Sequence, residues 1–319
     1  MTGLSGKVLV TGGTGSLGRA LLTRAEKENW NCEFFIFNRD ESKQAKVKAQ
    51  FPKHKYYLGD IAKYPDISSV VRGIRPDIIA HFAALKRIPT SMEQGMPTVE
   101  TNIIGSMNVI EAALEYGVAK VVATSTDKAC WLGINLYGAS KNVMEHLFKD
   151  ANKWEKTQFH LTRYGNILAS TGSVYPFFRS QVKRGGPVTV TMGEATRFWL
   201  DLNEGLDLVL LALAQEPGVI VIPKAGAMSM EDFAKCVIGD LDIKIQTIGL
   251  RSGEKIHEHM ISLEESMYCT QNEKYFFFYP YIYGIQNEDL FSYSSDNPNH
   301  WLTNEEILQK VQVSHSLGS

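Results

Sequence analysis

The 319-residue chain has few cysteines, and they lie far apart. Since Cys32, Cys130, Cys236 and Cys269 include no CxxC pair, the sequence argues against a disulfide framework and against a structural zinc site. Cysteine usage of this kind is typical of a reducing compartment, so we expect the protein to be cytoplasmic.

The chain also lacks an excess of one charge and any long hydrophobic run. Its 33 Lys and Arg residues balance 35 Asp and Glu residues, which gives no support to a nucleic-acid or anionic-membrane surface. Apolar runs such as Leu208 to Ala214 are far shorter than the roughly 20 residues of a membrane helix. We find no signal-peptide pattern before the first strand-like run. The composition therefore indicates a soluble globular protein, and its length suits two lobes or one large domain.

Strand-like runs alternate with helical patterns in the first half of the chain. We expect helices near 16–28, 98–116 and 136–152, and strands at 7–10, 33–37, 77–82, 120–125 and 158–164. This alternation predicts an α/β fold, a Rossmann-like doubly wound parallel sheet, with a smaller mixed α/β substrate lobe. The predicted dinucleotide-binding domain covers residues 1–168 and about 203–224, and the predicted substrate lobe covers about 169–202 and 225–319.

Two kinds of segment in the second half have an unusual composition. Residues 172–187 and 217–226 are rich in glycine and proline, so we expect the chain to pass between lobes there. Seven of the nine residues from Tyr275 to Tyr283 are aromatic, and only Lys274 borders them. With so little positive charge, a packed strand of the smaller lobe or of a subunit contact is favoured over a platform for nucleic-acid bases.

A glycine-rich segment, Thr11-Gly12-Gly13-Thr14-Gly15-Ser16-Leu17-Gly18, follows the first strand and begins the first helix. Glycines at 12, 15 and 18 permit a tight turn, close approach of a pyrophosphate and close helix–strand packing. The N–H groups of the helix N-terminus would bind the anion, so the motif predicts a dinucleotide site. After the second strand, Asn38 stands where NAD sites place a carboxylate, and Arg39 follows it. This favours NADP, with NAD left possible because of the neighbouring Asp40.

Two further motifs combine groups that can transfer protons. Tyr137 and Lys141 lie four residues apart on one predicted helical face, where a positive charge would lower the pKa of the phenol. Thr126, Asp127 and Lys128 follow the strand at 120–125, at the edge of the sheet where α/β enzymes place their chemistry. We therefore predict an active site at this edge.

Together, these motifs resemble those of the extended short-chain dehydrogenase/reductases and, more narrowly, of the soluble inverting UDP-N-acetylglucosamine 4,6-dehydratases of polysaccharide biosynthesis. The resemblance spans nearly the whole chain. It rests on the glycine motif and on His81-Phe82-Ala83-Ala84-Leu85-Lys86, Ser125-Thr126-Asp127-Lys128-Ala129, Asn135-Leu136-Tyr137-Gly138-Ala139-Ser140-Lys141, Arg163-Tyr164-Gly165-Asn166, Thr196-Arg197-Phe198-Trp199 and Arg251-Ser252-Gly253-Glu254-Lys255.

The resemblance implies a role for each catalytic candidate. Tyr137 removes the proton of the sugar 4-hydroxyl while the C4 hydride passes to the nicotinamide, and Thr126 hydrogen-bonds the same oxygen. Lys128 is the candidate base for the C5 proton, provided that its pKa is lowered. Asp127 would protonate the departing 6-hydroxyl, and Lys141 would support Tyr137 and the nicotinamide ribose. Hydride then returns to C6, and the resemblance favours inversion at C5.

The resemblance also implies the ligand contacts. Substrate contacts would come from Lys86, Asn166, Arg197, Arg251 and Glu254. Cofactor contacts would come from Gly12, Thr14, Gly15, Ser16, Leu17, Gly18, Asn38, Arg39, Asp60, Ile61, Ala83, Ala84, Tyr137 and Lys141. Because alternate helical residues diverge by about 200°, we do not expect a metal site at His257-Glu258-His259.

The chain departs from the family pattern in three places. The loop at 130–134 replaces a shorter one that contains Asn-Pro, Ser252 replaces a proline, and Ala169-Ser170-Thr171 replaces Gly-Ser-Arg. The altered loop would cover the sugar, so three alternatives stay open: a UDP-sugar 4-epimerase, a 5,6-dehydratase and a non-catalytic NADP sensor. Relatives of this kind commonly dimerise through two helices, here near 98–116 and 136–152, so we also expect a homo-oligomer.

Overall fold

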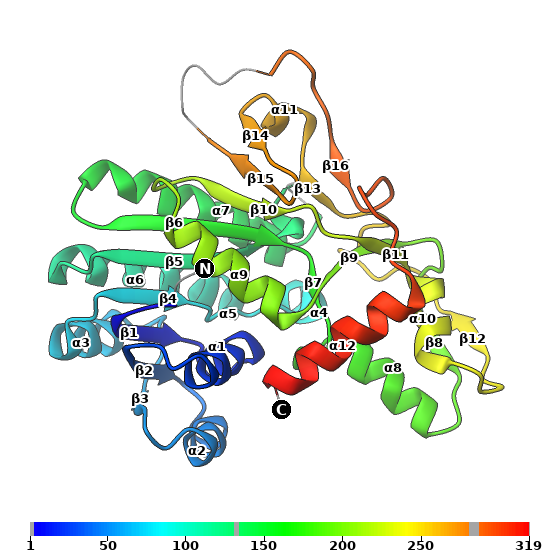
Figure 1. Cartoon of the computed structure of the whole chain (residues 1–319), viewed down its shortest axis with the longest axis horizontal. Helices are drawn as coiled ribbons and strands as arrows, with labels where there is room; N and C mark the ends of the chain where they lie inside the picture. Colours follow the sequence, from blue (N-terminus) through cyan, green and yellow to red (C-terminus); the bar gives the residue numbers. More distant parts are fainter. Residues whose placement is uncertain (1–2, 131–133, 281–286, 319) are drawn as a thin grey trace.

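A large sheet dominates the computed structural model, which describes residues 3–130, 134–280 and 287–318 (Figure 1). Within these ranges the strand order is β14-β15-β10-β6-β5-β4-β1-β2-β3. Neighbours from β3 to β10 pair in parallel, whereas β15 pairs antiparallel with both β10 and β14. The strands are β1 (Gly6–Thr11), β2 (Cys32–Asn38), β3 (Lys55–Leu58), β4 (Ile78–His81), β5 (Lys120–Thr126), β6 (Gln158–Tyr164), β10 (Ile220–Pro223), β14 (Cys269–Gln271) and β15 (Tyr275–Phe278).

Helices cover both faces of this sheet. On one face α3 packs on α6 and α6 packs on α7, and on the other α1, α9 and α12 pack together. Val8 to Thr11 of the central strand β1 are buried, because helices exclude water from both faces of the sheet there. These helices are α1 (Ser16–Lys27), α3 (Tyr64–Ile74), α6 (Gly105–Tyr116), α7 (Leu136–Ala151), α9 (Leu202–Leu213) and α12 (Asn304–Gly318); α2 (Glu41–Gln50), α4 (Ile88–Glu93) and α5 (Gly95–Val99) lie in connections.

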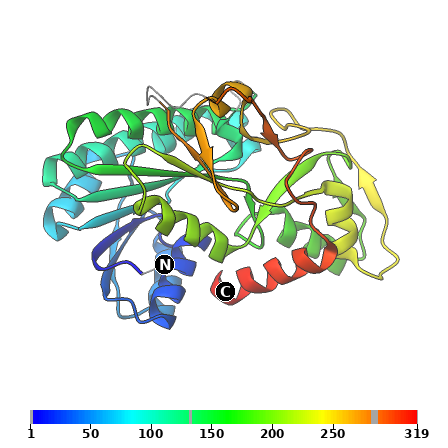
Figure 2. The same cartoon turned by 45° about the horizontal axis from the view of Figure 1, so that its top comes forward.

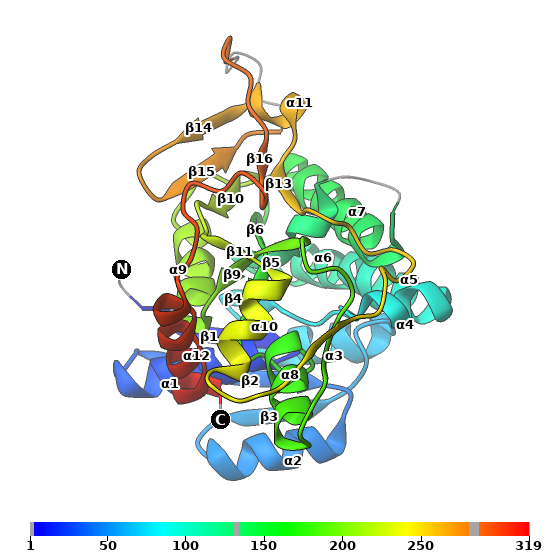
Figure 3. The same ribbon diagram turned by 90° about the vertical axis from the view of Figure 1, so that its right-hand side faces the viewer.

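A smaller lobe with its own apolar core lies beyond the carboxyl ends of the strands (Figures 2 and 3). Phe178, Trp199 and Phe233 are buried in this core. The remaining elements are α8 (Val174–Lys183), α10 (Met230–Ile238), α11 (Leu263–Ser266), β7 (Asn166–Ile167), β8 (Val188–Val190), β9 (Thr196–Leu200), β11 (Ala227–Ser229), β12 (Ile245–Thr247), β13 (His259–Ile261) and β16 (Tyr293–Ser294). No helix in the described ranges is long and apolar enough to cross a membrane.

The structure confirms the predicted α/β class and doubly wound sheet. Strand order reverses between β1 and β4, which is the switch point where such sheets bind ligands. The sequence missed β3 and β10, and both segments predicted as passages between lobes contain regular structure, namely α8 and β10. Pro176 lies in the first turn of α8 and Pro223 is the last residue of β10, positions at which proline does not interrupt a helix or a strand.

The aromatic segment is a correction to the sequence prediction. Residues 275–278 form β15 of the main sheet and not a strand of the smaller lobe, because their backbone pairs with β10 and buries Phe276 and Phe278 against the main core. Therefore β14 and β15 extend the dinucleotide-binding sheet, although the sequence predicts their residues as part of the substrate lobe. Tyr281 to Tyr283 lie outside the described residues.

Candidate active site

The glycine loop connects β1 to α1 at the switch point. Gly12 has a φ of +69°, and a Cβ atom there would lie 2.7 Å from the Ala83 backbone that follows β4. A Cβ atom on Gly18 would lie 2.4 Å from the Gly13 carbonyl oxygen. Gly15 caps α1 without a side chain, so the first N–H groups of the helix are open to a ligand. The loop therefore has the close backbone approach and the anion site that a dinucleotide needs.

Polar side chains follow β2 and β3 beside this loop. Asn38 Oδ1 accepts a hydrogen bond from the Thr14 N–H at 3.3 Å. The half-exposed Arg39 guanidinium lies 3.6 Å from Asp60, and Ile61 packs beneath Gly105. Thus the candidate residues for the adenosine end of a cofactor converge at one edge of the sheet.

A segment of the smaller lobe contacts the start of α1. The Thr171 N–H donates to Ser16 Oγ at 2.9 Å, and the two hydroxyl groups lie 3.2 Å apart. Thr171 occupies one of the positions where this chain departs from the family pattern. The Leu17 side chain is buried, so the glycine loop would present its backbone to a dinucleotide.

Thr126, Asp127 and Lys128 lie at the carboxyl end of β5, where the chain enters a 3₁₀ turn at 127–129. Thr126 Oγ1 donates to Asp127 Oδ1 at 2.9 Å. Gly138 in the first turn of α7 makes this arrangement possible, because a Cβ atom there would lie 2.2 Å from the Lys128 carbonyl oxygen. The structure thus packs the Asp-Lys segment directly against the helix that carries Tyr137.

Three oxygen atoms surround the Lys128 ammonium. Lys128 Nζ lies 2.9 Å from Asp127 Oδ1, 3.2 Å from Glu258 Oε1 and 3.4 Å from Asn166 Oδ1. Desolvation favours the neutral amine, but the two carboxylates outweigh it and raise the pKa of Lys128 above its ordinary value. The condition attached to Lys128 as the base, a lowered pKa, is therefore not met in this structure.

The two carboxyl groups beside Lys128 titrate differently. Burial raises the pKa of Asp127, which favours its protonated form and suits a proton donor. Burial also acts on Glu258, but the charges of Lys128, Arg197 and Lys255 outweigh it and lower the pKa of Glu258. The pKa values of the two carboxyl groups beside Lys128 are therefore shifted in opposite directions.

Tyr137 and Lys141 lie on α7 as predicted, and both side chains are buried. Desolvation raises the pKa of Tyr137 against the opposing effects of the Lys128 charge and the Thr126 hydroxyl, so the predicted lowering is not found. Burial lowers the pKa of Lys141 to about 8, and its ammonium donates to the Thr124 carbonyl oxygen at 2.8 Å. The charge that favours ionisation of Tyr137 is therefore that of Lys128.

The predicted substrate residues divide into two groups. Lys86 is accessible after β4, where desolvation lowers its pKa, and Asn166 contacts Lys128. Arg251 is half-exposed beside Glu254, on a loop that Asn135 anchors through a 2.9 Å hydrogen bond to the Gly253 carbonyl oxygen. Of these four residues, Asn166 contacts the Asp-Lys segment, and the loop with Arg251 and Glu254 is joined to the N-cap of α7 through Gly253.

Arg197, in contrast, is buried and holds the backbone of the smaller lobe. Its guanidinium donates to the carbonyl oxygens of Thr196, Lys255 and Ile256 at 2.6–2.9 Å. The expectation that Arg197 contacts the substrate does not agree with this geometry. Its N–H groups fix the segment that leads to Glu258.

Sequence reasoning missed two residues of the site. His257, Glu258 and His259 were treated as helical, but they lead into β13 and bring Glu258 to Lys128. Asn102, in a π-helical turn at 100–104, donates to Ser140 Oγ at 2.9 Å and bonds both backbone groups of Leu85. Only the three-dimensional arrangement identifies these contacts. Among the described residues, no cluster could hold a metal ion.

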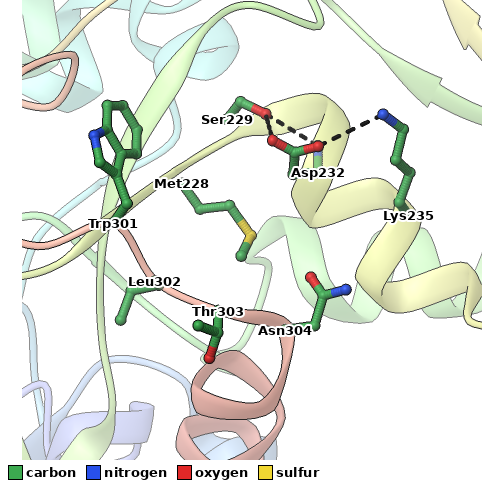
Figure 4. Close-up of a pocket in the computed structure, with 8 residues that line it drawn as sticks. All are labelled: Met228, Ser229, Asp232, Lys235, Trp301, Leu302, Thr303 and Asn304. Carbon is green, nitrogen blue, oxygen red and sulfur yellow. Dashed lines mark hydrogen bonds and ion pairs between the residues drawn. The ribbon is translucent and has the colours of Figure 1, made fainter.

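A separate hollow of about 440 Å³ lies on the smaller lobe (Figure 4). Its walls come from α10 and the start of α12, and Ser229 and Lys235 both contact Asp232 across one side. None of the predicted site residues lines this hollow. The candidate active site is therefore identified by the side chains that converge at the carboxyl edge of the sheet, and not by this hollow.

A glycine loop at the switch point, with Tyr137 and Lys141 on the helix after β5, defines the class of extended short-chain dehydrogenase/reductases. Residues 8–280 match the family described as polysaccharide biosynthesis protein, and the chain belongs to that family. It is 38% identical to the UDP-N-acetylglucosamine 4,6-dehydratase (inverting) of Campylobacter jejuni subsp. jejuni serotype O:2, over 95% of this chain and 96% of the relative. It is also 42% identical to a UDP-glucose 4-epimerase of Rickettsia bellii, over 81% of this chain and 78% of the relative.

Solved structures agree with this class. The X-ray structure of Pen from Bacillus thuringiensis has a TM-score of 0.89 and 31% identity, with 99% of both chains covered. DesIV, a dTDP-glucose 4,6-dehydratase from Streptomyces venezuelae solved with NAD and TYD, has a TM-score of 0.70 and 21% identity, over 78% of this chain and 86% of that chain. The resemblance predicted from the motifs is confirmed.

Proposed function

We propose that the protein is a UDP-N-acetylglucosamine 4,6-dehydratase that forms a 6-deoxy-4-keto sugar with inversion at C5. The observation that carries this proposal is the cluster of Asp127, Lys128 and Glu258 beside Tyr137. Oxidation at C4 requires only one proton acceptor, whereas removal of water across C5 and C6 also requires a base and an acid. The cluster supplies groups for both of these additional steps.

Each residue has a defined task in this mechanism. Tyr137 accepts the proton of the 4-hydroxyl, and Thr126 hydrogen-bonds the same oxygen. Lys128, after loss of one proton, removes the proton from C5, the electron pair forms the C5–C6 double bond, and Asp127 protonates the oxygen that leaves C6 as water. The raised pKa of Asp127 supports its role as the acid. Lys86, Asn166, Arg251 and Glu254 remain our proposed substrate contacts.

The glycine loop and its neighbours fit a nicotinamide dinucleotide, and we propose NADP, with NAD as the alternative. When bound, the nicotinamide accepts hydride from C4 and returns it to C6. The open N–H groups of α1 would bind the pyrophosphate. Lys141 would hold the nicotinamide ribose, and Arg39 would bind the 2′-phosphate. The other proposed contacts are Gly12, Thr14, Ser16, Leu17, Asn38, Asp60, Ile61, Ala83, Ala84 and Tyr137.

Incubation with UDP-N-acetylglucosamine in deuterated water tests the function. We expect a 6-deoxy-4-keto product labelled at C5, with no net reduction of the cofactor, and the NMR coupling pattern should report inversion. An unlabelled UDP-N-acetylgalactosamine product would indicate an epimerase, which the Rickettsia relative keeps as the second candidate. An exocyclic alkene would indicate a 5,6-dehydratase. Cofactor binding without turnover would indicate a sensor.

Replacement of Lys128 with Ala should lower the rate of solvent exchange at C5, because it removes the amine that lies 2.9 Å from Asp127 and 3.2 Å from Glu258. General base catalysis contributes about 10²- to 10⁴-fold, so the residual exchange should fall by that factor. The measurement is deuterium incorporation at C5 by NMR. Lys235→Ala, at an exposed position of α10, is the control. Persistent exchange in Lys128→Ala would remove Lys128 from the mechanism.

Replacement of Arg39 with Ala should weaken NADP binding roughly tenfold and leave NAD binding within about twofold, because one charged hydrogen bond to the 2′-phosphate is lost. Titration calorimetry with each cofactor measures the two affinities. Lys43→Ala, an exposed cation on the adjacent helix α2, is the matched control. Tighter binding of NAD than of NADP by the unmodified protein would reverse the assignment.

The predicted homo-oligomer remains a proposal. Ile104 and Met107, at the start of α6, and Val143, on α7, are 40%, 45% and 38% exposed. These exposed apolar side chains lie on the two helices through which we expect subunits to associate.

A further inference from the structure

Glu258 is buried and contacts the proposed base, and the sequence analysis considered it only as part of a metal motif that it rejected. Its side chain is 1% exposed, and its Oε1 atom lies 3.2 Å from Lys128 Nζ. A carboxylate in such a position is costly to bury unless it is paired, so the surrounding structure must be organised to hold it.

The surrounding structure does fix Glu258. Its backbone N–H donates to Ser295 Oγ at 2.9 Å, and its carbonyl oxygen accepts from the Ser295 N–H at 2.8 Å. Arg197 donates to the carbonyl oxygens of Lys255 and Ile256, three and two positions before Glu258, and its Nε lies 3.8 Å from Glu258 Oε1. The carboxylate is thus held from one side by the smaller lobe and meets Lys128 from the other.

Lys128 is consequently held as a full ammonium. Its three protons face three acceptors, one each on Asp127, Asn166 and Glu258. An ammonium cannot take a further proton, so Lys128 must lose one before it acts on C5. A residue that controls the loss of this proton from Lys128 therefore controls the dehydration step.

We propose that Glu258 is a positioning residue of the dehydration: its carboxylate anchors the Lys128 ammonium opposite Asp127 and controls when Lys128 gives up the proton that it must lose. This inference rests on the proposed function. The charged and titratable groups around Lys128 are Asp127 on its own turn, Tyr137 on α7, Arg197 on β9, and Lys255 and Glu258 before β13.

The first test is the pH profile of C5 exchange for Glu258→Gln, measured by NMR with saturating UDP-N-acetylglucosamine. Loss of one anion beside the ammonium lowers the pKa of Lys128. The rising limb of the plot of C5 exchange rate against pH should therefore move roughly 1–3 pH units toward acid. The plateau should also fall, because Lys128 loses an anchor. Glu258→Asp keeps the charge and should keep the limb near its original position.

Two further variants separate charge from structure. Asn166→Asp adds an anion at the third acceptor and should move the limb toward alkali, and combining it with Glu258→Gln should return the limb to near its original position. Glu265→Gln is the matched control, since Glu265 is a carboxylate of the same lobe that pairs with Arg163 and not with Lys128. Its limb should not move.

The outcomes are distinct. If Glu258→Gln lowers the plateau without moving the limb, Glu258 has only a structural role and the inference is overturned. If Glu258→Gln does not fold, an unmoved limb in Asn166→Asp overturns it equally. If the unmodified protein shows no C5 exchange at all, the proposed function fails first, and that result does not depend on Glu258.

Discussion

Replacement of Tyr137 with Phe should lower turnover of UDP-N-acetylglucosamine by about 10²- to 10⁴-fold, the usual contribution of a positioned proton acceptor. The phenol is buried at the start of α7, close enough to Lys128 and Thr126 for both to favour its ionisation. Phe keeps the aromatic packing and removes only the oxygen. The loss should therefore be in kcat, with little change in the free energy of unfolding.

Product formation by NMR and substrate affinity by calorimetry test this expectation together. Tyr56→Phe is the matched control, because Tyr56 also donates hydrogen bonds through its hydroxyl, to Val47 and Phe51, but lies on β3 away from the site. Its turnover should be unchanged. Turnover of Tyr137→Phe within threefold of the original would show that another group accepts the 4-hydroxyl proton.

Replacement of Arg163 with Leu should lower the free energy of unfolding by about 3–5 kcal/mol, because it leaves two carboxylates without their buried cation. Arg163 on β6 bonds Glu145 of α7 at 2.7 and 3.0 Å and Glu265 of α11 at 2.8 Å. It also donates to the Met260 carbonyl oxygen of β13 at 2.9 Å. One side chain thus joins the helix that carries Tyr137 to the segment that carries Glu258.

Urea denaturation followed by circular dichroism measures this loss. Arg179→Leu, an exposed arginine on α8, should change the free energy of unfolding by no more than about 0.5 kcal/mol. A triple variant with Leu at 145, 163 and 265 should recover much of the stability, since it removes the unpaired charges as well. A loss below 1 kcal/mol in Arg163→Leu would mean that solvent or other groups satisfy both carboxylates.

The sequence predicted those parts of the fold that depend on local patterns. Apolar runs separated by amphipathic helices predicted β1, β2, β4, β5 and β6, and the glycine spacing predicted the loop at the switch point. These features can be inferred because the interactions that specify them lie within about 20–30 residues of one another, in single strand–helix units.

Contacts between segments that lie far apart in the chain could not be predicted from the sequence. The position of β15 depends on backbone hydrogen bonds with β10, more than 50 residues earlier in the chain, and composition alone suggested a different lobe. Arg197 looked like a ligand for phosphate because its charge was visible in the sequence and its carbonyl partners were not.

The sequence by itself determined the fold class, the glycine loop, the Tyr–Lys pair and the Asp–Lys segment, since each is a local arrangement of residue types. Only the tertiary structure decided the protonation states. The pKa of Lys128 depends on Glu258, 130 residues later, and that of Tyr137 depends on burial and on Lys128. The strength of a charge interaction depends on the distance between the groups and on their burial, and both quantities are set by the tertiary structure and not by the sequence order.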